Sequence, residues 1–183
     1  MPHVPHQVRI VESNPAWPAA FSEIAALVRG ALGPVAVRVE HVGSTAVPGL
    51  AAKPVIDVQL SVASFDPLDA YAAPLGALGY EYRSDDEPEH RFFALISDSG
   101  ERLVNLHVCR AGSEWERRHL AFRDALRADP DVRDRYEAEK RRVAALHPDD
   151  SLAYAEAKTP WIRAEERRLN SRPAPRPPRS ARR

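Results

Sequence analysis

The strongest constraint on the fold of this chain is a pair of strand-like segments that flank a loop of small residues. Residues 35–42 read VAVRVEHV and residues 55–62 read VIDVQLSV, so apolar and polar side chains alternate in both. Such alternation is typical of a strand that buries one face in a core. The loop between them, residues 43–54, is rich in glycine, alanine and proline. We therefore expect two strands, the second of which carries three polar side chains opposite its apolar face: Asp57, Gln59 and Ser61.

The rest of the chain predicts helices around further strands. Asn14-Pro15 and Asp66-Pro67 are typical of helix starts, with the N-cap residue followed by proline at the first helical position. They predict one helix that ends near Gly30 and another that ends near Leu78. The remaining predicted elements are a short strand at 80–83, a hairpin of 91–97 with 102–109, and helices at 113–128, 131–146 and 152–169. The predicted fold class is α/β (α+β), with a mixed β-sheet flanked by helices and a C-terminal three-helix block.

Composition indicates a globular protein and gives no sign of a partner recognised by net charge. The 183 residues are 44% hydrophobic and 28% charged, and the formal net charge of zero gives no reason to expect nucleic acid or an anionic membrane. We predict one domain over residues 1–170 and a disordered arginine- and proline-rich tail over 171–183. The sequence shows neither a secretory signal nor a membrane helix, so a cytoplasmic location is expected. The single cysteine, Cys109, follows an apolar run and is predicted to be a buried strand residue.

The candidate site lies where the first strand ends. Gly43 and Ser44 follow that strand at once, and Asp57 lies on the second strand. A glycine there lets a phosphate approach backbone N–H groups, and a serine hydroxyl adds a donor to the same anion. The carboxylate can hold Mg²⁺ against the phosphates, and Lys53 can neutralise further negative charge. The competing interpretation is a glycine turn with a capping serine and an aspartate that simply faces solvent.

The stretch HVGSTAVPGLAAKPVIDV, residues 41–58, closely resembles the signature of the GrpB family, whose domain is also fused to some bacterial dephospho-CoA kinases. The resemblance covers residues 8–165 and includes, in the family's order, Trp17, Phe21, Leu78 to Tyr80, Arg91 to Phe93, Asn105 to Val108, Phe122 to Asp124, Tyr136 to Lys140 and Tyr154 to Lys158. It implies a nucleotidyltransferase-like core in a bacterial, cytoplasmic protein. It also implies a nucleoside triphosphate and Mg²⁺ as ligands.

The candidate metal ligands depart from the pattern of the nucleotidyltransferase superfamily, which has two acidic residues on the strand after Gly-Ser and a third on a later strand. Gln59 stands at the second acidic position, and Asn105 and His107 lie on the later strand. Such a set is a poor Mg²⁺ site, because Mg²⁺ prefers anionic oxygens. His41, Asp57 and His107 together would suit a transition metal or acid–base chemistry near neutral pH. Either histidine could equally be an ordinary strand-end residue; the resemblance favours a functional His107.

Four basic residues outside the loop are candidate contacts to a phosphorylated ligand: Arg91, Arg123, Lys140 and Lys158. Arg91 is a candidate anion clamp, since its strand is expected to border the pocket; the alternative is a strand-edge charge. Arg123 could contact phosphate, or pair with Asp124 and orient its helix. Each of the two lysines follows a tyrosine by four residues, which is usually packing with a snorkelling amine. Because both match the family pattern, the resemblance makes them second-rank ligand contacts.

Three functions follow from these residues. The first is transfer of a nucleotidyl or phosphoryl group from a nucleoside triphosphate to a small polar acceptor, with Ser44, Asp57 and His107 as catalytic residues. The second is a non-catalytic or regulatory module that binds a small polar or phosphorylated ligand in a degenerate nucleotidyltransferase pocket, without a metal. The third and weakest is a transition-metal hydrolase. Nucleic acid is not an expected partner in any of them.

Overall fold

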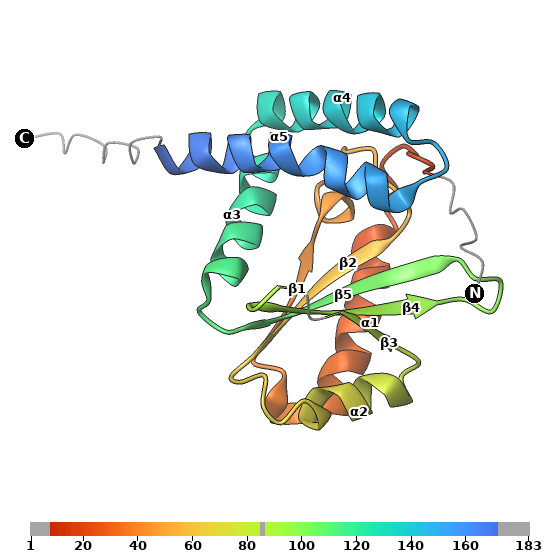
Figure 1. The fold of residues 1–183 in the computed structure, drawn as a ribbon, viewed down its shortest axis with the longest axis vertical. Coiled ribbons are helices and arrows are strands. Elements are labelled where there is room, and N and C mark those ends of the chain that lie inside the picture. The colour runs from red at the N-terminus through yellow and green to blue at the C-terminus, as the bar shows by residue number, and fades with distance from the viewer. Residues whose placement is uncertain (1–7, 85–86, 172–183) are drawn as a thin grey trace, which may run out of the picture.

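A computed structural model describes residues 8–84 and 87–171, and Figure 1 shows their arrangement. Apart from Ser171, the predicted disordered tail lies outside the described residues. One five-stranded mixed sheet runs through the molecule, in the order β1-β2-β5-β4-β3. β2 and β5 are parallel, and the other neighbours are antiparallel. The strands are β1 (Arg38–Val42), β2 (Ile56–Val62), β3 (Glu81–Ser84), β4 (His90–Ile96) and β5 (Arg102–Arg110).

One face of the sheet is apolar and is covered by α1 (Trp17–Leu32) and α2 (Asp69–Ala77). The main core lies between these helices and alternate residues of β2, β5 and β4, including Val58, Leu106 and Phe93. The strand periodicity seen in the sequence therefore places the core as predicted.

Both early helices begin later than their sequence signals predicted. α1 begins at Trp17, because the Asn14 side chain accepts a hydrogen bond from the Ala16 amide (2.9 Å) and closes a turn ahead of the helix. α2 begins at Asp69, and its N-cap position is occupied by Leu68 without a side-chain cap. Asp66 is therefore not the N-cap of α2.

The opposite face is polar and lies under the C-terminal helices α3 (Glu114–Ala128), α4 (Pro130–Leu146) and α5 (Ser151–Ser171). α3 packs on β1 and β5, while α4 and α5 run side by side across one end of the sheet (Figure 1). Ser113 and Asp129 cap α3 and α4 through their side chains. The mixed sheet with its flanking helices and the three-helix block are thus confirmed.

A second apolar cluster ties the loop after β1 to this helical block. Val47 and Leu50 of the loop pack with Leu126, Val132 and Tyr136 of the helices. The loop is therefore held between the end of β1 and the face of α4, and its first residues are fixed close to β2. In the part of the chain that the structure describes, no helix has the length and apolar character to cross a membrane.

Candidate functional site

The turn at Gly43 packs directly against the Asp57 carboxylate. Gly43 has φ of +69°, and a Cβ added to it would lie 2.2 Å from Asp57 Oδ2. Only glycine therefore allows this approach of backbone and carboxylate. The next residue, Ser44, begins a short 3₁₀ turn (Ser44–Ala46), and its hydroxyl is close enough to the Tyr136 hydroxyl to lower the pKa of Tyr136 against the larger effect of burial. The structure thus brings Gly43, Ser44 and Asp57 together.

The parallel pairing of β2 with β5 supplies the partners of Asp57. Asp57 is in register with Asn105, whose Nδ2 donates to Asp57 Oδ1 at 2.8 Å. His107 Nε2 lies 3.7 Å from the same oxygen. Burial alone would raise the pKa of Asp57, but the hydrogen bonds and charge of these neighbours, with the charge of Lys158, hold it below its ordinary value. Asp57 is therefore an ionised carboxylate at neutral pH.

Three lysines lie around this carboxylate. The Nζ atoms of Lys53 and Lys158 lie 5.6 and 4.2 Å from the centroid of the Tyr154 ring, and Lys53 also donates to Ser151 Oγ. Lys140 lies 5.1 Å from the Tyr136 ring centroid and donates to the Ala51 carbonyl.

The three ammonium groups are electrostatically coupled to the site. Burial lowers the pKa of Lys140 to about 7 and that of Lys158 to about 8, and it also lowers the pKa of Lys53. The negative charge of Asp57 acts in the opposite direction on all three. All three lysines are thus close enough to the Asp57 carboxylate to sense its charge.

A group of aromatic and histidine rings extends the site along the sheet. His90 Nε2 and His107 Nδ1 are 3.0 Å apart. His90 stacks on one side of Trp115 at 4.8 Å between ring centroids, and His119 stacks on Trp115 at 3.5 Å. Burial lowers the pKa of His90 to about 3, so it is neutral at pH 7. His107 thus contacts His90 through Nδ1 and directs Nε2 toward Asp57.

Sequence reasoning missed His90 and His119, which have surface-like neighbours in the sequence. The alternation of β4 places His90 and Phe92 on one face, and the register of β4 with β5 pairs Phe92 with His107. That register is not readable from the sequence, because the two strands shift by one residue next to their connection. The same strand places Arg91 on the opposite face, where its guanidinium lies 4.3 Å from the Phe65 ring centroid. Arg91 is thus not directed toward Asp57.

His41 also faces away from Asp57. It pairs with Val58 on the apolar face, stacks on Phe21 at 4.6 Å, and its Nε2 lies 3.0 Å from Thr45 Oγ1. Burial lowers its pKa to about 4. The proposed set of His41, Asp57 and His107 is therefore not brought to one point. Over residues 8–84 and 87–171, no group of three or more His, Cys, Asp or Glu side chains could hold a metal ion.

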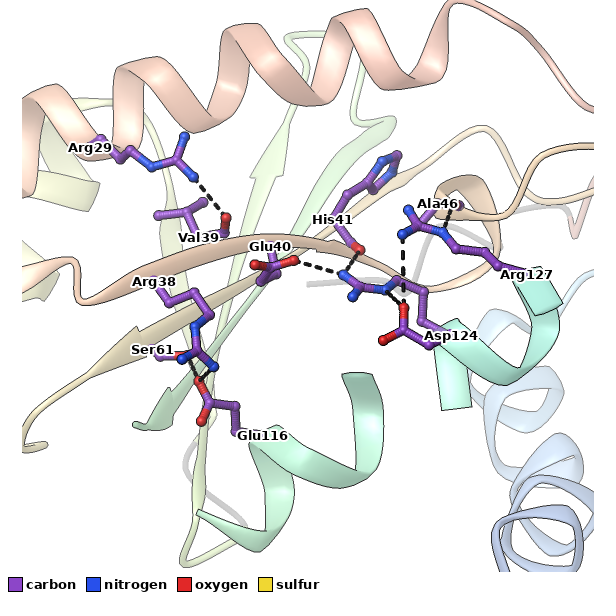
Figure 2. A network of polar contacts seen from close by, with 11 residues as sticks. Arg29, Arg38, Val39, Glu40, His41, Ala46, Ser61, Glu116, Asp124 and Arg127 are labelled. Carbon is purple, nitrogen blue, oxygen red and sulfur yellow. Dashed lines mark hydrogen bonds and ion pairs between the residues drawn. The ribbon is translucent and has the colours of Figure 1, made fainter. Parts of the chain in front are cut away.

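Arg123 belongs to a polar network that joins α3 to β1, and Figure 2 labels its partners Glu40, His41 and Asp124. Its guanidinium donates to Glu40 Oε2 at 2.8 Å, to the His41 carbonyl at 3.0 Å and to Asp124 Oδ1 at 2.8 Å. Of the two roles considered for Arg123, the geometry is that of the internal ion pair. Arg38, Ser61 and Glu116 make a second such contact at the start of α3, visible in the same view.

Comparisons with known proteins agree with this picture. The family model described as GrpB protein matches residues 7–168. UPF0157 protein BH1888 of Halalkalibacterium halodurans is 38% identical over 171 residues, which cover 91% of this chain and 86% of that protein. A dephospho-CoA kinase of Mycolicibacterium paratuberculosis is 36% identical over 186 residues, but these cover 88% of this chain and only 46% of that protein. The chain thus spans about half the length of this relative, as the fused arrangement implies.

A solved structure has the same fold. The crystal structure of conserved protein GrpB from Enterococcus faecalis superposes with a TM-score of 0.79 at 32% identity, over 88% of this chain and 96% of that one. The match of the family model to nearly the whole described chain, and the shared fold, bear out the resemblance seen in the sequence. This chain belongs to the GrpB protein family.

Proposed function

We propose that this protein binds a nucleoside polyphosphate around Ser44 and Asp57, in a nucleotidyltransferase-like pocket that takes its positive charge from lysines. One observation carries the proposal. The chain has 26 lysines and arginines, and its only lysines are Lys53, Lys140 and Lys158, each of which senses the charge of Asp57. All the other residues in that count are arginines. A lysine ammonium is a compact point charge that can contact a phosphate chain from any direction, whereas a guanidinium needs a planar, bidentate partner.

The same residues do not fit a two-metal centre. Of the candidate ligands that lie together, only Asp57 carries a carboxylate, and its Oδ1 already accepts a hydrogen bond from Asn105. Mg²⁺ in phosphate sites is usually held by one or two carboxylates together with substrate phosphates. Because ammonium groups lie close to the single carboxylate, we expect the lysines to neutralise the phosphates. The role proposed here is accordingly recognition of the ligand without turnover.

Group transfer to a small polar acceptor is the second candidate function. It is favoured by the contact between the Gly43 turn and the Asp57 carboxylate, which leaves the carboxylate beside the place proposed for the phosphates. This function needs Mg²⁺ at Asp57. The two candidates therefore disagree about what the negative charge of Asp57 does to ligand binding.

Calorimetric titration of ATP into the protein, in EDTA and in Mg²⁺, separates them. We expect binding in EDTA that weakens by about tenfold or more in Lys158→Met, because a charge-assisted contact to phosphate is lost. Asp57→Asn should bind ATP more tightly, because the change removes an anion that repels the phosphates. Arg142→Met, an exposed charge change on α4, is the matched control and should bind as the wild type does.

Other results decide against the proposal. Binding that requires Mg²⁺ and is lost in Asp57→Asn would support group transfer. Absence of ATP binding in both conditions would refute both candidates.

A further inference from the structure

The Gln59 side chain is buried without a hydrogen-bond partner for either atom of its amide. It is fully buried at the centre of the polar face of β2, between Asp57 and Ser61. The Oδ1 atom of Asn105, on the neighbouring strand, is also buried and unpartnered. Buried polar groups are normally paired, because a donor or acceptor removed from water without a partner costs free energy. These two amides are therefore an exception that calls for a cause.

The groups around Gln59 do have partners. In the sheet register, Gln59 lies between Glu40 of β1 and His107 of β5. Glu40 accepts from Arg123, His107 is hydrogen-bonded to His90, and Ser61 donates to Glu116. The rest of the polar face around Gln59 is thus satisfied. On this face of the sheet, among the residues that the structure describes, the unpaired buried side-chain atoms belong to two amides next to Asp57.

We propose that Gln59 and Asn105 form an uncharged subsite that recognises the nucleoside part of the phosphorylated ligand. This inference rests on the function proposed above. Gln59 offers two N–H donors and a carbonyl acceptor, and Asn105 offers a further carbonyl acceptor. A group that both donates and accepts hydrogen bonds, such as a ribose hydroxyl or the amide-like edge of a base, satisfies them. A phosphate does not, because it lacks hydrogen-bond donors at neutral pH.

The Gln59 amide is itself fully buried, but two of its neighbours in the sheet reach the accessible surface. The side chains of Asp57, two residues earlier on β2, and of His107, the partner of Gln59 on β5, are 25% and 24% exposed. A ligand that pairs with the Gln59 amide therefore has to enter between these two side chains. Its phosphates would then extend toward Lys53 and Lys158, while its uncharged part faces the sheet.

The test compares two probes, ATP and inorganic tripolyphosphate, by calorimetric titration in EDTA. Both should bind through the lysines, and ATP should bind at least about tenfold more tightly, because it alone can pair the amides. Gln59→Leu should weaken ATP to the level of tripolyphosphate and leave tripolyphosphate unchanged. It should also raise the melting temperature of the free protein, because an unpaired buried amide is replaced by an apolar side chain of similar volume. Gln59→Met is a second variant with the same expectation.

Ser61→Ala is the matched control, since Ser61 is on the same strand and face but is already paired with Glu116. It should lower the melting temperature and keep the preference for ATP. Equal binding of the two probes by the wild type would overturn the subsite and leave the proposed function standing. The same holds if Gln59→Leu weakens both probes equally or destabilises the free protein. Absence of tripolyphosphate and ATP binding would overturn both inferences.

Discussion

Replacement of Arg123 by methionine should destabilise the protein and leave ATP binding unchanged. The Arg123 side chain is only 10% exposed, and it joins α3 to β1 through Glu40 and the His41 carbonyl. Loss of one partner from a buried ion pair costs about 3–5 kcal/mol. Glu40 is 35% exposed, so water recovers part of its hydration, and we expect about 3 kcal/mol. For a chain of this length that corresponds to a fall in melting temperature of about 6–12 °C.

The assay pairs urea denaturation with ATP titration. Arg117→Met, which removes an exposed arginine from the same helix, should change the free energy of unfolding by less than about 0.5 kcal/mol. Combining Arg123→Met with Glu40→Gln should cost less than the sum of the single changes, because the two side chains are partners. The reasoning is refuted if Arg123→Met keeps its stability and loses ATP affinity, since Arg123 would then be a ligand contact.

Three further predictions concern the turn, a lysine and the cysteine. Gly43→Ala should destabilise the protein by about 1–3 kcal/mol and weaken ATP binding, because the added Cβ would collide with Asp57. Gly30→Ala in α1, where an added Cβ meets no atom within 4 Å, should instead stabilise the protein by about 0.5–1 kcal/mol. Equal effects of the two substitutions on urea unfolding would contradict this prediction. Lys140 has a folded pKa of about 7 against 10.5 when free, so the unfolded state binds more protons between these values. Wild type should therefore gain stability relative to Lys140→Met as pH rises from about 7 to about 10, and a constant difference between their urea midpoints would refute the shift. Cys109 is buried and burial raises its pKa to about 12, so a thiol reagent should react only as the protein unfolds; rapid labelling of the native protein would show otherwise.

Much of the fold could be predicted because its signals are local. The alternation of β2 and the capping residues Ser113 and Asp129 each act within a few residues of the element they define. The predicted starts of α1 and α2 were wrong because they, too, relied on local signals alone. Asn14 and Asp66 are good capping residues, but each lies upstream of a helix that begins elsewhere. Residue preference alone does not decide between a turn and a cap.

The site was predictable only in part, because it depends on which strands pair and in what register. Asp57 and Ser44 could be proposed from one continuous segment. The contact of His90 with His107 requires the register of β4 on β5, and the role of Arg123 requires the packing of α3 on β1. One signal was present in the sequence and is easily overlooked. A chain that uses arginine almost everywhere keeps lysine at three positions, and the fold brings them to one place.

The pairing of β2 with β5 has a consequence for how the molecule unfolds locally. β1 and β2 form one antiparallel unit, β3 to β5 form another, and the parallel β2–β5 pair is the seam between them. Asp57 belongs to the first unit and Asn105 to the second, 48 residues away in the chain. Neither unit carries the site alone. A nucleotide bound across the seam would act as a clamp, and it should slow amide hydrogen exchange along β2 and β5 more than along the outer edge of β3.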